Sequence, residues 1–221
     1  MKKFFLFCII VAMVCTLTKL SAQVNLTNGL IAWYPLNGNA NDSSGNGRNG
    51  IVNNAKPAHD RFGKSHGAYY CDGTKKAITV LAFNDYNAKG ATLSIWIKTK
   101  KNASALQVIT GAVGSLYLNV HKIGTFLGDF DGELTHLTGA SASDSVVTNG
   151  KWVNITATND GTNTKLYWNG ILQKSYPEKL SVGVSNLIIA NKGYVGSIDD
   201  VRIYNRAISA DEAAAIYNLT Y

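Results

Sequence analysis

The feature that most constrains the fold is a succession of short apolar, β-branched or aromatic segments bounded by polar turn residues. These segments are residues 30–34, 68–71, 77–81, 93–97, 106–109, 116–120, 152–157, 165–168, 171–172, 187–190 and 201–204. The turns between them contain Asn37-Gly38, Asp72-Gly73, Asp131-Gly132, Asn149-Gly150, Asp160-Gly161 and Asn169-Gly170. Glycine accepts the positive φ that tight hairpins need, so this pattern predicts an antiparallel β-sandwich or barrel.

Apolar and polar residues alternate along several of the predicted strands. Leu93, Ile95 and Ile97 fall on one face of their strand, and Ser94 and Trp96 fall on the other. Such alternation is typical of antiparallel sheets that bury one face against a second layer and leave the opposite face to water or a ligand.

The clear helix signal is near the C-terminus. Ser209 and Glu212 have the spacing of a capping box, in which each side chain bonds to the backbone of the other residue. Residues 213–217 then favour a helix. No internal repeat, low-complexity segment or linker divides the chain, so we expect a single domain.

The N-terminus has the pattern of a secretory signal peptide. Lys2 and Lys3 precede an apolar run over residues 4–14, which is shorter than the roughly 20 residues that span a bilayer. We therefore expect residues 1–22 to be cleaved and residues 23–221 to form the mature domain. The protein is then secreted to the periplasm, the cell surface or the medium, with no membrane span after cleavage. A retained anchor is the alternative.

The charge and the cysteines exclude some classes of function. The formal net charge is +7, and removal of the three leader lysines reduces it to +4. No run of Lys or Arg exceeds two residues, which argues against nucleic acid as a partner. Cys8 and Cys15 leave with the leader, so Cys71 cannot form an internal disulfide. We expect it to be a small buried hydrophobe rather than a catalytic thiol.

Three longer motifs carry a family resemblance. They are GLIAWYPLNG at residues 29–38, NDSSGNGRNG at 41–50 and GSIDDVRIYNRAISADE at 196–212. The landmarks between them are residues 62–64, 71–73, 93–96, 152–153 and 166–170. In this order, over residues 28–220, they resemble the laminin G-like (LamG type 3) domains of the concanavalin A-like lectin/glucanase superfamily.

The resemblance implies an all-β fold, a two-sheet antiparallel jelly-roll sandwich with one short C-terminal helix. One curved sheet would offer a concave face, and the first and last segments of the chain would meet and close the same sandwich. The sequence departs from the family at Trp168, Asn169 and Cys71, where an aliphatic residue, aspartate and phenylalanine are frequent. We interpret these departures as variations in packing.

The best metal candidate joins the two ends of the chain. Calcium prefers several oxygen ligands, and the loop of residues 41–50 offers Asp42 with the amide oxygens of Asn46 and Asn49. By the resemblance, the first aspartate of an Ile-Asp-Asp-Val strand often helps to hold a structural calcium. Asp199 matches that position, so we predict a structural calcium with Asp199 and Asp42 as ligands.

A second interpretation of these two aspartates needs no metal. Asp42 would cap its own turn through side-chain-to-backbone hydrogen bonds, and Asp199 would pair with a base such as Arg202 or Arg206. On a straight strand, Asp199 shares a face with Val201 and Ile203. Ile198, Asp200 and Arg202 would then take the opposite face.

One cluster of acids is compatible with catalysis. Asp129, Asp131 and Glu133 alternate, which resembles the acids of jelly-roll glucanases that act by retaining hydrolysis. That family has glutamate at the first position, and Asp131-Gly132 is a strong turn signal that would separate the carboxylates. We therefore favour a solvated turn, and nothing else in the sequence supports nucleophilic catalysis.

Ligand recognition would use aromatic rings and amides on an open sheet face, because sugar faces stack on rings and hydroxyls need planar polar partners. Tyr117 and Asn119 lie on the non-apolar face of their predicted strand and are our candidate ligand-binding residues. Trp96 and Tyr167 could be placed similarly. The alternative for Trp96 and Trp152 is a framework role, packed inside.

These features predict a secreted, monomeric, non-catalytic binding module, carbohydrate-binding or adhesive, whose partner is a glycan or a cell-surface protein. The alternatives are a protein-interaction domain at the cell surface and, less favoured, a glycoside hydrolase that uses Asp129, Asp131 and Glu133.

Overall fold

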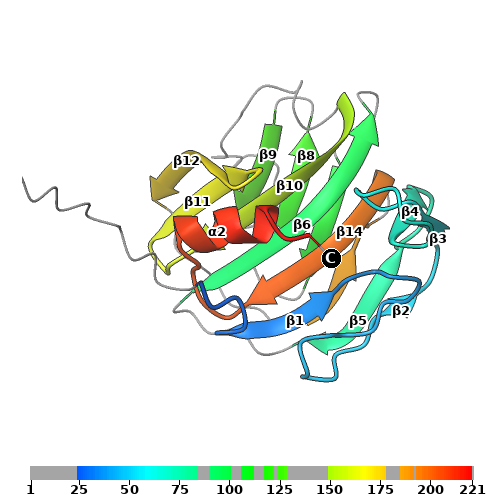
Figure 1. Ribbon diagram of the computed structural model, residues 1–221, viewed down its shortest axis with the longest axis horizontal. Helices are drawn as coiled ribbons and strands as arrows, with labels where there is room; N and C mark the ends of the chain where they lie inside the picture. The colour runs from blue at the N-terminus through cyan, green and yellow to red at the C-terminus, as the bar shows by residue number, and fades with distance from the viewer. Residues whose placement is uncertain are drawn as a thin grey trace, which may run out of the picture.

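The computed structural model describes residues 24–83, 90–100, 106–111, 117–121, 124–128, 149–177, 185–191 and 193–220. These residues form two antiparallel sheets and one short helix, which confirms the predicted fold class (Figure 1). No helix in these ranges has the length and apolarity needed to cross a bilayer.

The larger sheet has eight strands. Their order is β12 (Ile171–Pro177), β11 (Asn163–Trp168), β10 (Asn149–Asn159), β6 (Ala91–Lys100), β14 (Val195–Tyr204), β4 (Ala68–Asp72) and β3 (Lys56–Ala58), with β1 (Leu30–Tyr34) also paired to β14. The six-stranded sheet has the order β2 (Ile51–Val52), β5 (Ile78–Phe83), β13 (Ser185–Ile189), β7 (Leu106–Gly111), β8 (Tyr117–His121) and β9 (Gly124–Gly128).

The core lies between the two sheets. The predicted alternation holds in β6, where Leu93, Ile95 and Ile97 are buried in the core. From the opposite sheet, Leu187 and Ile189 of β13 reach the same core. Each sheet therefore has an inner face toward this core and an outer face directed away from it.

The two ends of the chain meet as predicted. Strand β1 pairs antiparallel with β14, so that Leu30 lies opposite Tyr204 and Tyr34 opposite Val201. This pairing brings together residues that are far apart in the sequence, and it closes one edge of the sandwich.

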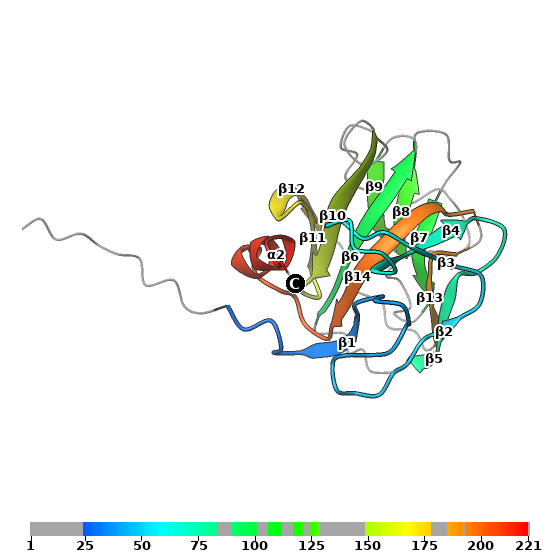
Figure 2. The same cartoon turned by 45° about the vertical axis from the view of Figure 1, so that its right-hand side comes forward.

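Helix α2 (Ala210–Tyr217) begins with the predicted capping box. Ser209 Oγ accepts a hydrogen bond from the Glu212 backbone N–H at 3.2 Å, and Glu212 Oε2 accepts one from the Ser209 backbone N–H at 2.7 Å. The helix lies on the outer side of the eight-stranded sheet, away from β7, β8 and β9 (Figures 1 and 2).

A predicted hairpin turn fits against this helix. Asn169 and Gly170 both have positive φ, 49° and 75°, as a tight turn between β11 and β12 requires. A Cβ on Gly170 would lie 2.8 Å from the Cα of Ala214, so glycine is also what allows the turn to approach α2.

The predicted faces of β14 are wrong. Ile198, Val201 and Ile203 all belong to the core, although Ile198 was expected to lie opposite the other two. The cause is a β-bulge after Asp199, where the register with β6 shifts and Asp200 has a φ of 44°. A bulge inserts an extra residue and so reverses the alternation beyond it.

Cys71 behaves as predicted. Its side chain is buried in the core, and burial raises the pKa of the thiol to about 12, with Asp72 acting in the same direction. A thiol with so high a pKa carries almost no thiolate at neutral pH, which is the form that reacts.

Candidate functional site

The predicted ligand residues Tyr117 and Asn119 lie on β8 of the six-stranded sheet. Strand β8 lies between β7 and β9 and pairs antiparallel with both. The contact of Tyr117 and Asn119 with a ligand stays a prediction.

The acids Asp129, Asp131 and Glu133 lie outside the described residues, between the end of β9 and the start of β10 in the sequence. The predicted turn at Asp131-Gly132 and the hydrolase alternative both depend on this segment, and both stay predictions.

Asp42 organises the loop that follows β1. Its Oδ1 accepts backbone N–H bonds from Trp33 at 3.0 Å and Ser44 at 2.9 Å, and its Oδ2 accepts one from Arg48 at 3.0 Å. Its own backbone N–H donates to Asn49 Oδ1 at 2.9 Å. Burial acts to raise the pKa of Asp42, but the three backbone donors and the Ser44 side chain outweigh it and hold the pKa below its ordinary value.

Asp199 lies in a buried group of charges. Arg61 Nη1 contacts Asp199 Oδ2 at 2.5 Å, and Arg61 Nη2 lies 3.6 Å from Asp200 Oδ2. Asp200 Oδ1 accepts hydrogen bonds from Trp33 Nε1 at 2.6 Å and from Arg202 Nε at 3.2 Å. We call these five residues the Arg61 cluster. Its side chains reach it from β1, from the segment after β3 and from β14.

Burial raises the pKa of Asp199 to about 7, while Arg61 acts to lower it and Asp200 to raise it. Asp199 pairs with a basic residue, as one interpretation of the sequence predicted. That residue is Arg61, however, and not Arg202 or Arg206. Arg206 pairs with Glu212 at the start of α2.

The calcium prediction can be compared with these contacts. Among the residues that the structure describes, no three or more His, Cys, Asp or Glu side chains are grouped so that they could hold a metal ion. The carboxylates of Asp42 and Asp199 each have protein partners. The guanidinium of Arg48 also lies in the loop that Asp42 organises, where its Nη1 donates to the carbonyl of Ile31 at 2.7 Å. The two carboxylates therefore do not form a ready ligand set, and the calcium site stays a prediction.

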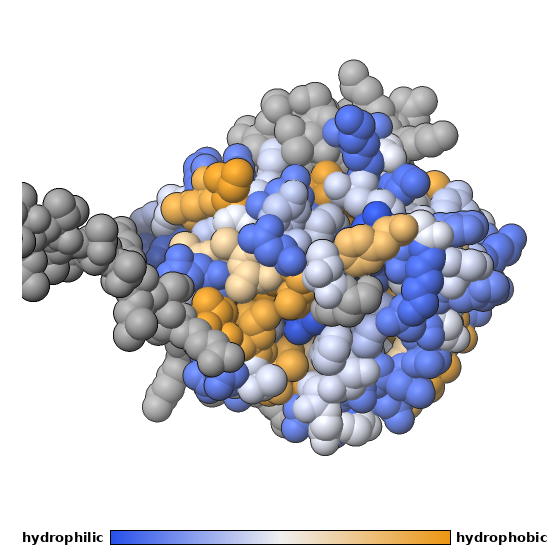
Figure 3. Space-filling view, in the orientation of Figure 1, coloured by the Kyte–Doolittle hydropathy of each residue, from blue (hydrophilic) through white to orange (hydrophobic). Residues whose placement is uncertain are grey.

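One half of the outer face of the eight-stranded sheet is covered. Tyr167 and Tyr204 pack with Ile208, Ala213 and Ile216, so the helix shields their strands from water. In the view of Figure 3, apolar surface gathers at β12 and between α2 and β1, whereas the side occupied by β3 and β4 is mainly hydrophilic.

Trp96 also lies in the covered half. It is 7% exposed, and its ring stacks on Tyr217 with the centroids 5.5 Å apart. The Arg61 guanidinium lies 4.8 Å from the Trp96 ring centroid and 4.6 Å from that of Phe62. The framework interpretation is therefore correct for Trp96, and Tyr167, 2% exposed, is likewise packed rather than open to a ligand.

The other half of this face is open and carries a row of cross-strand neighbours. Trp152 of β10 pairs with Lys98 of β6, Lys98 with Ser197 of β14, Ser197 with Tyr70 of β4, and Tyr70 with Lys56 of β3. We call these five residues the outer row. Tyr70 is 40% exposed, Lys98 and Lys56 are exposed, and the other two are half-buried.

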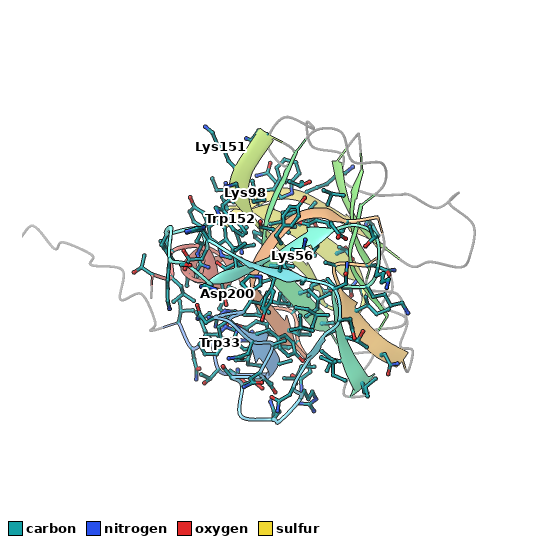
Figure 4. All side chains as sticks on the ribbon, turned by 90° about the vertical axis from the view of Figure 1, so that its right-hand side faces the viewer. Trp33, Lys56, Lys98, Lys151, Trp152 and Asp200 are labelled. Atoms are coloured by element: carbon teal, nitrogen blue, oxygen red, sulfur yellow. The ribbon has the colours of Figure 1, made fainter. Side chains whose placement is uncertain are left out.

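The two rings of the outer row are well separated. Trp152 and Tyr70 are three strand spacings apart, or about 14 Å. Figure 4 shows Trp152 and Lys98 close together on this face with Lys151 near them and Lys56 further across the sheet.

Two cavities adjoin the outer row. One has a volume of about 330 Å³ and is lined by Tyr70, Lys98, Thr99, Gly150, Val195, Gly196 and Ser197. The second, of about 300 Å³, is lined by Arg61, Phe62, Trp96, Trp152, Tyr217, Asn218, Leu219 and Thr220. Tyr70, Lys98 and Ser197 of the outer row line the first cavity, and Trp152, which pairs with Lys98, lines the second.

Sequence reasoning did not identify the outer row. The alternation in β6 places Lys98 opposite the core, and the same signal exists for Tyr70, which lies between the buried residues Tyr69 and Cys71. However, nothing in the sequence indicates that residues from positions 56 to 197 lie side by side, because that depends on strand order and register.

Comparison with known families gives one match. The family model Laminin_G_3, described as the concanavalin A-like lectin/glucanases superfamily, matches residues 61–214. No curated protein sequence matches the chain significantly.

Solved structures with this fold include binding domains. Domain 4 of AbnA, a GH43 extracellular arabinanase from Geobacillus stearothermophilus, in complex with arabinotriose, matches 86% of this chain and 98% of its own, with 20% identity and a TM-score of 0.65. The ligand binding domain of botulinum neurotoxin serotype D in complex with N-acetylneuraminic acid matches 86% of this chain, with 17% identity and a TM-score of 0.61.

The binding domain of botulinum neurotoxin DC in complex with rat synaptotagmin II matches 89% of this chain, with 16% identity and a TM-score of 0.67. This chain spans 51% of the serotype D domain and 53% of the DC domain. At these identities the likeness shows the fold alone.

Proposed function

Because this chain belongs to the laminin G type 3 (Laminin_G_3) family of the concanavalin A-like lectin/glucanases superfamily, we propose that it is a secreted, non-catalytic carbohydrate-binding module. We place its ligand surface on the outer row and the two cavities beside it. Strand β8, with Tyr117 and Asn119, is the second candidate surface.

The observation that carries this proposal is the outer row itself. Trp152 and Tyr70 offer two rings on strands about 14 Å apart, and Lys98 and Ser197 occupy the positions between them on the two intervening strands. Rings that stack on apolar sugar faces, together with hydrogen-bonding groups that read hydroxyls, are what carbohydrate recognition needs. The two cavities give this surface the concave shape of a ligand site.

Two neighbours support a glycan as the ligand. The arabinanase domain that was solved with arabinotriose is matched over 98% of its length, so the whole of that domain has this fold. The toxin domain solved with N-acetylneuraminic acid is matched over about half of its length, so it supports the proposal less directly.

The test is a broad glycan array followed by calorimetry with Trp152→Ala and Tyr117→Ala variants. We expect a glycan to bind and Trp152→Ala to weaken it at least tenfold, while Tyr117→Ala leaves it unchanged. The reverse result would move the site to the six-stranded sheet. No binding of any glycan at high protein concentration would refute a carbohydrate-binding function.

A protein ligand is the second candidate. Strand β12 lies at the edge of the eight-stranded sheet and exposes Ile171 by 67% and Leu172 by 49%. Exposed apolar residues on an edge strand are suited to pairing with another chain, and one structural neighbour was solved with the protein synaptotagmin II. A cell-surface protein captured by the wild type but not by Ile171→Lys would favour this function.

Catalysis is the third candidate. It depends on Asp129, Asp131 and Glu133 as the acids of a glycoside hydrolase. Incubation of the protein with polysaccharides, followed by reducing-end analysis, should show no products. Cleavage that is lost in Glu133→Gln would establish hydrolysis instead.

We also propose export and a structural calcium ion. Mass spectrometry of the protein from its native host should find a mature N-terminus at Gln23. Calcium at about a hundred times its dissociation constant would stabilise the fold by roughly 2.7 kcal/mol. A chelator should then lower the melting temperature of the wild type but not of Asp42→Ala or Asp199→Ala. An identical melting curve with and without chelator would remove calcium from the proposal.

A further inference from the structure

We propose that the outer row selects anionic glycans, with the charged group of the sugar held by Lys98. This inference rests on the proposed function and specifies the ligand. The sugar that carries the anion would lie over β6 and β14, and the flanking parts of the glycan would contact Trp152 and Tyr70.

The position of Lys98 supports this assignment. It is the second member of the outer row, one strand spacing from Trp152 and two from Tyr70. Among the described residues that line the 330 Å³ cavity, Lys98 is the one with a charge. An anion that enters this cavity therefore meets an ammonium group between two rings.

Among the described residues, no carboxylate forms an ion pair with Lys98. In the described part of the chain, the ion pairs join Arg61, Arg202 and Arg206 to carboxylates, and none involves Lys98 or Lys151. The carboxylates of the Arg61 cluster, Asp199 and Asp200, are paired within that buried cluster.

The outer row ends at Lys56, whose positive charge interacts with the carboxylate of Asp72. Hydrogen bonds from the Thr74 backbone N–H and hydroxyl are the main cause that holds the pKa of the exposed Asp72 carboxyl below its ordinary value, and the charge of Lys56 acts in the same direction. Near the outer row, Lys98 and Lys151 thus have no ion pair with a described residue. Figure 4 shows these two lysines on the same side of the molecule as Trp152.

An ammonium group distinguishes an anionic sugar from a neutral one. A hydrogen bond in which both partners are charged is about twice as strong as one between neutral groups, and lysine binds carboxylate or sulfate as a point charge. A neutral sugar would gain only an ordinary hydrogen bond from Lys98. The structure thus predicts a preference for charge, while carboxylated and sulfated sugars share the chemistry that Lys98 recognises.

The experiment uses matched pairs of glycans on one array. Each carboxylated glycan stands beside its methyl ester, and each sulfated glycan beside its desulfated form. We expect the anionic member of a pair to bind at least tenfold more tightly, and the affinity to fall as salt is raised. The pairs that respond will show whether the anion is carboxylate or sulfate.

Three variants assign the effect to one residue. Lys98→Gln should lose the tenfold preference for the anionic member, and Lys98→Arg should keep most of it. Lys174→Gln removes the same charge from β12, at the opposite edge of the sheet from β3, and should change nothing.

The outcomes separate this inference from the proposed function. Equal binding of charged and neutral members, or a preference that survives in Lys98→Gln, would overturn the inference and leave carbohydrate binding intact. If no glycan binds at all, the proposed function fails, and the inference fails with it.

Discussion

The outer face of the eight-stranded sheet is divided into two halves that are built from the same alternating strands. In one half, Tyr167 and Tyr204 lie beneath α2, and Trp96 lies beneath Tyr217 and Arg61. In the other half, Tyr70, Lys98 and Ser197 of the outer row line one cavity, and Trp152 lines a second cavity at the boundary with the covered half. The two halves differ because α2 and the segment after β3 pack over the first half only. An outward position on a strand is therefore a surface position only where no later segment covers it.

If this division is correct, substitutions in the covered half should cost stability, and those in the open half should not. The largest loss is expected for Asp200→Ala. It removes the buried carboxylate that accepts hydrogen bonds from Trp33 and Arg202. Removal of one partner from a buried ion pair costs about 3–5 kcal/mol, and the positive φ of Asp200 adds strain for alanine. Denaturant unfolding measures the loss.

Asp200→Asn is the matched control for that variant. Asparagine tolerates positive φ and keeps one acceptor oxygen, so the loss should be smaller. If both variants lost less than about 1 kcal/mol, the Arg61 cluster would not be a stabilising part of the covered half.

The second largest effect is expected for Ile216→Ala. Ile216 is fully buried between α2 and the sheet, and such a truncation costs about 3 kcal/mol through lost burial and the cavity left behind. Leu172→Ala is the control, because Leu172 is 49% exposed on β12 and should change stability by at most about 0.5 kcal/mol. Similar losses for the two variants would mean that α2 does not cover the sheet tightly.

A third, smaller effect is that the free energy of unfolding should depend on pH through Asp199. The pKa of Asp199 is about 7 in the folded protein and near its ordinary value of 3.8 in the unfolded chain. Between pH 4 and pH 7 the folded state therefore holds a proton that the unfolded state releases. The contribution of Asp199 to the free energy of unfolding therefore falls as the pH rises from 4 to 7, by at most about 1.4 kcal/mol per pH unit.

Asp199→Asn should abolish this slope, as measured by denaturant unfolding at a series of pH values. Asp42 provides the contrast. Its lowered pKa means that its contribution is present above pH 3.8 and is lost only as the pH falls through the folded value. A wild-type stability that rises between pH 4 and pH 7 and is unaffected by Asp199→Asn would contradict the assignment.

The smallest effect is expected in the open half. Lys98→Gln and Tyr70→Ser alter exposed residues of the outer row and should change the free energy of unfolding by at most about 0.5 kcal/mol. Thermal and denaturant unfolding can check this directly. A loss above 1 kcal/mol in Lys98→Gln would place Lys98 in the structural framework and end the distinction between the two halves.

Much of the fold could be predicted from the sequence. The strand segments, the turn at Asn169-Gly170, the capping box of Ser209 with Glu212 and the buried Cys71 all depend on residues close together in the chain. The predicted segments did not include β2, β3 or β9. In β14, strict alternation assigned Ile198 to the wrong face. The bulge after Asp199 is stabilised by long-range contacts of Asp200, which strand periodicity does not contain.

The candidate site could not be predicted in the same way. The sequence suggested Tyr117 and Asn119, and it suggested a base near Asp199 in the sequence. The structure pairs Asp199 with Arg61, 138 positions away, and assembles the outer row from five separate strands.

The sequence by itself determined that this chain forms hairpin-connected strands around one core, because hydrophobic alternation and turn geometry act over a few residues. Only the tertiary structure decided which outward-facing side chains are covered and which remain open. That outcome depends on strand order, register and the place where α2 docks, and these follow from packing between segments that the chain keeps far apart.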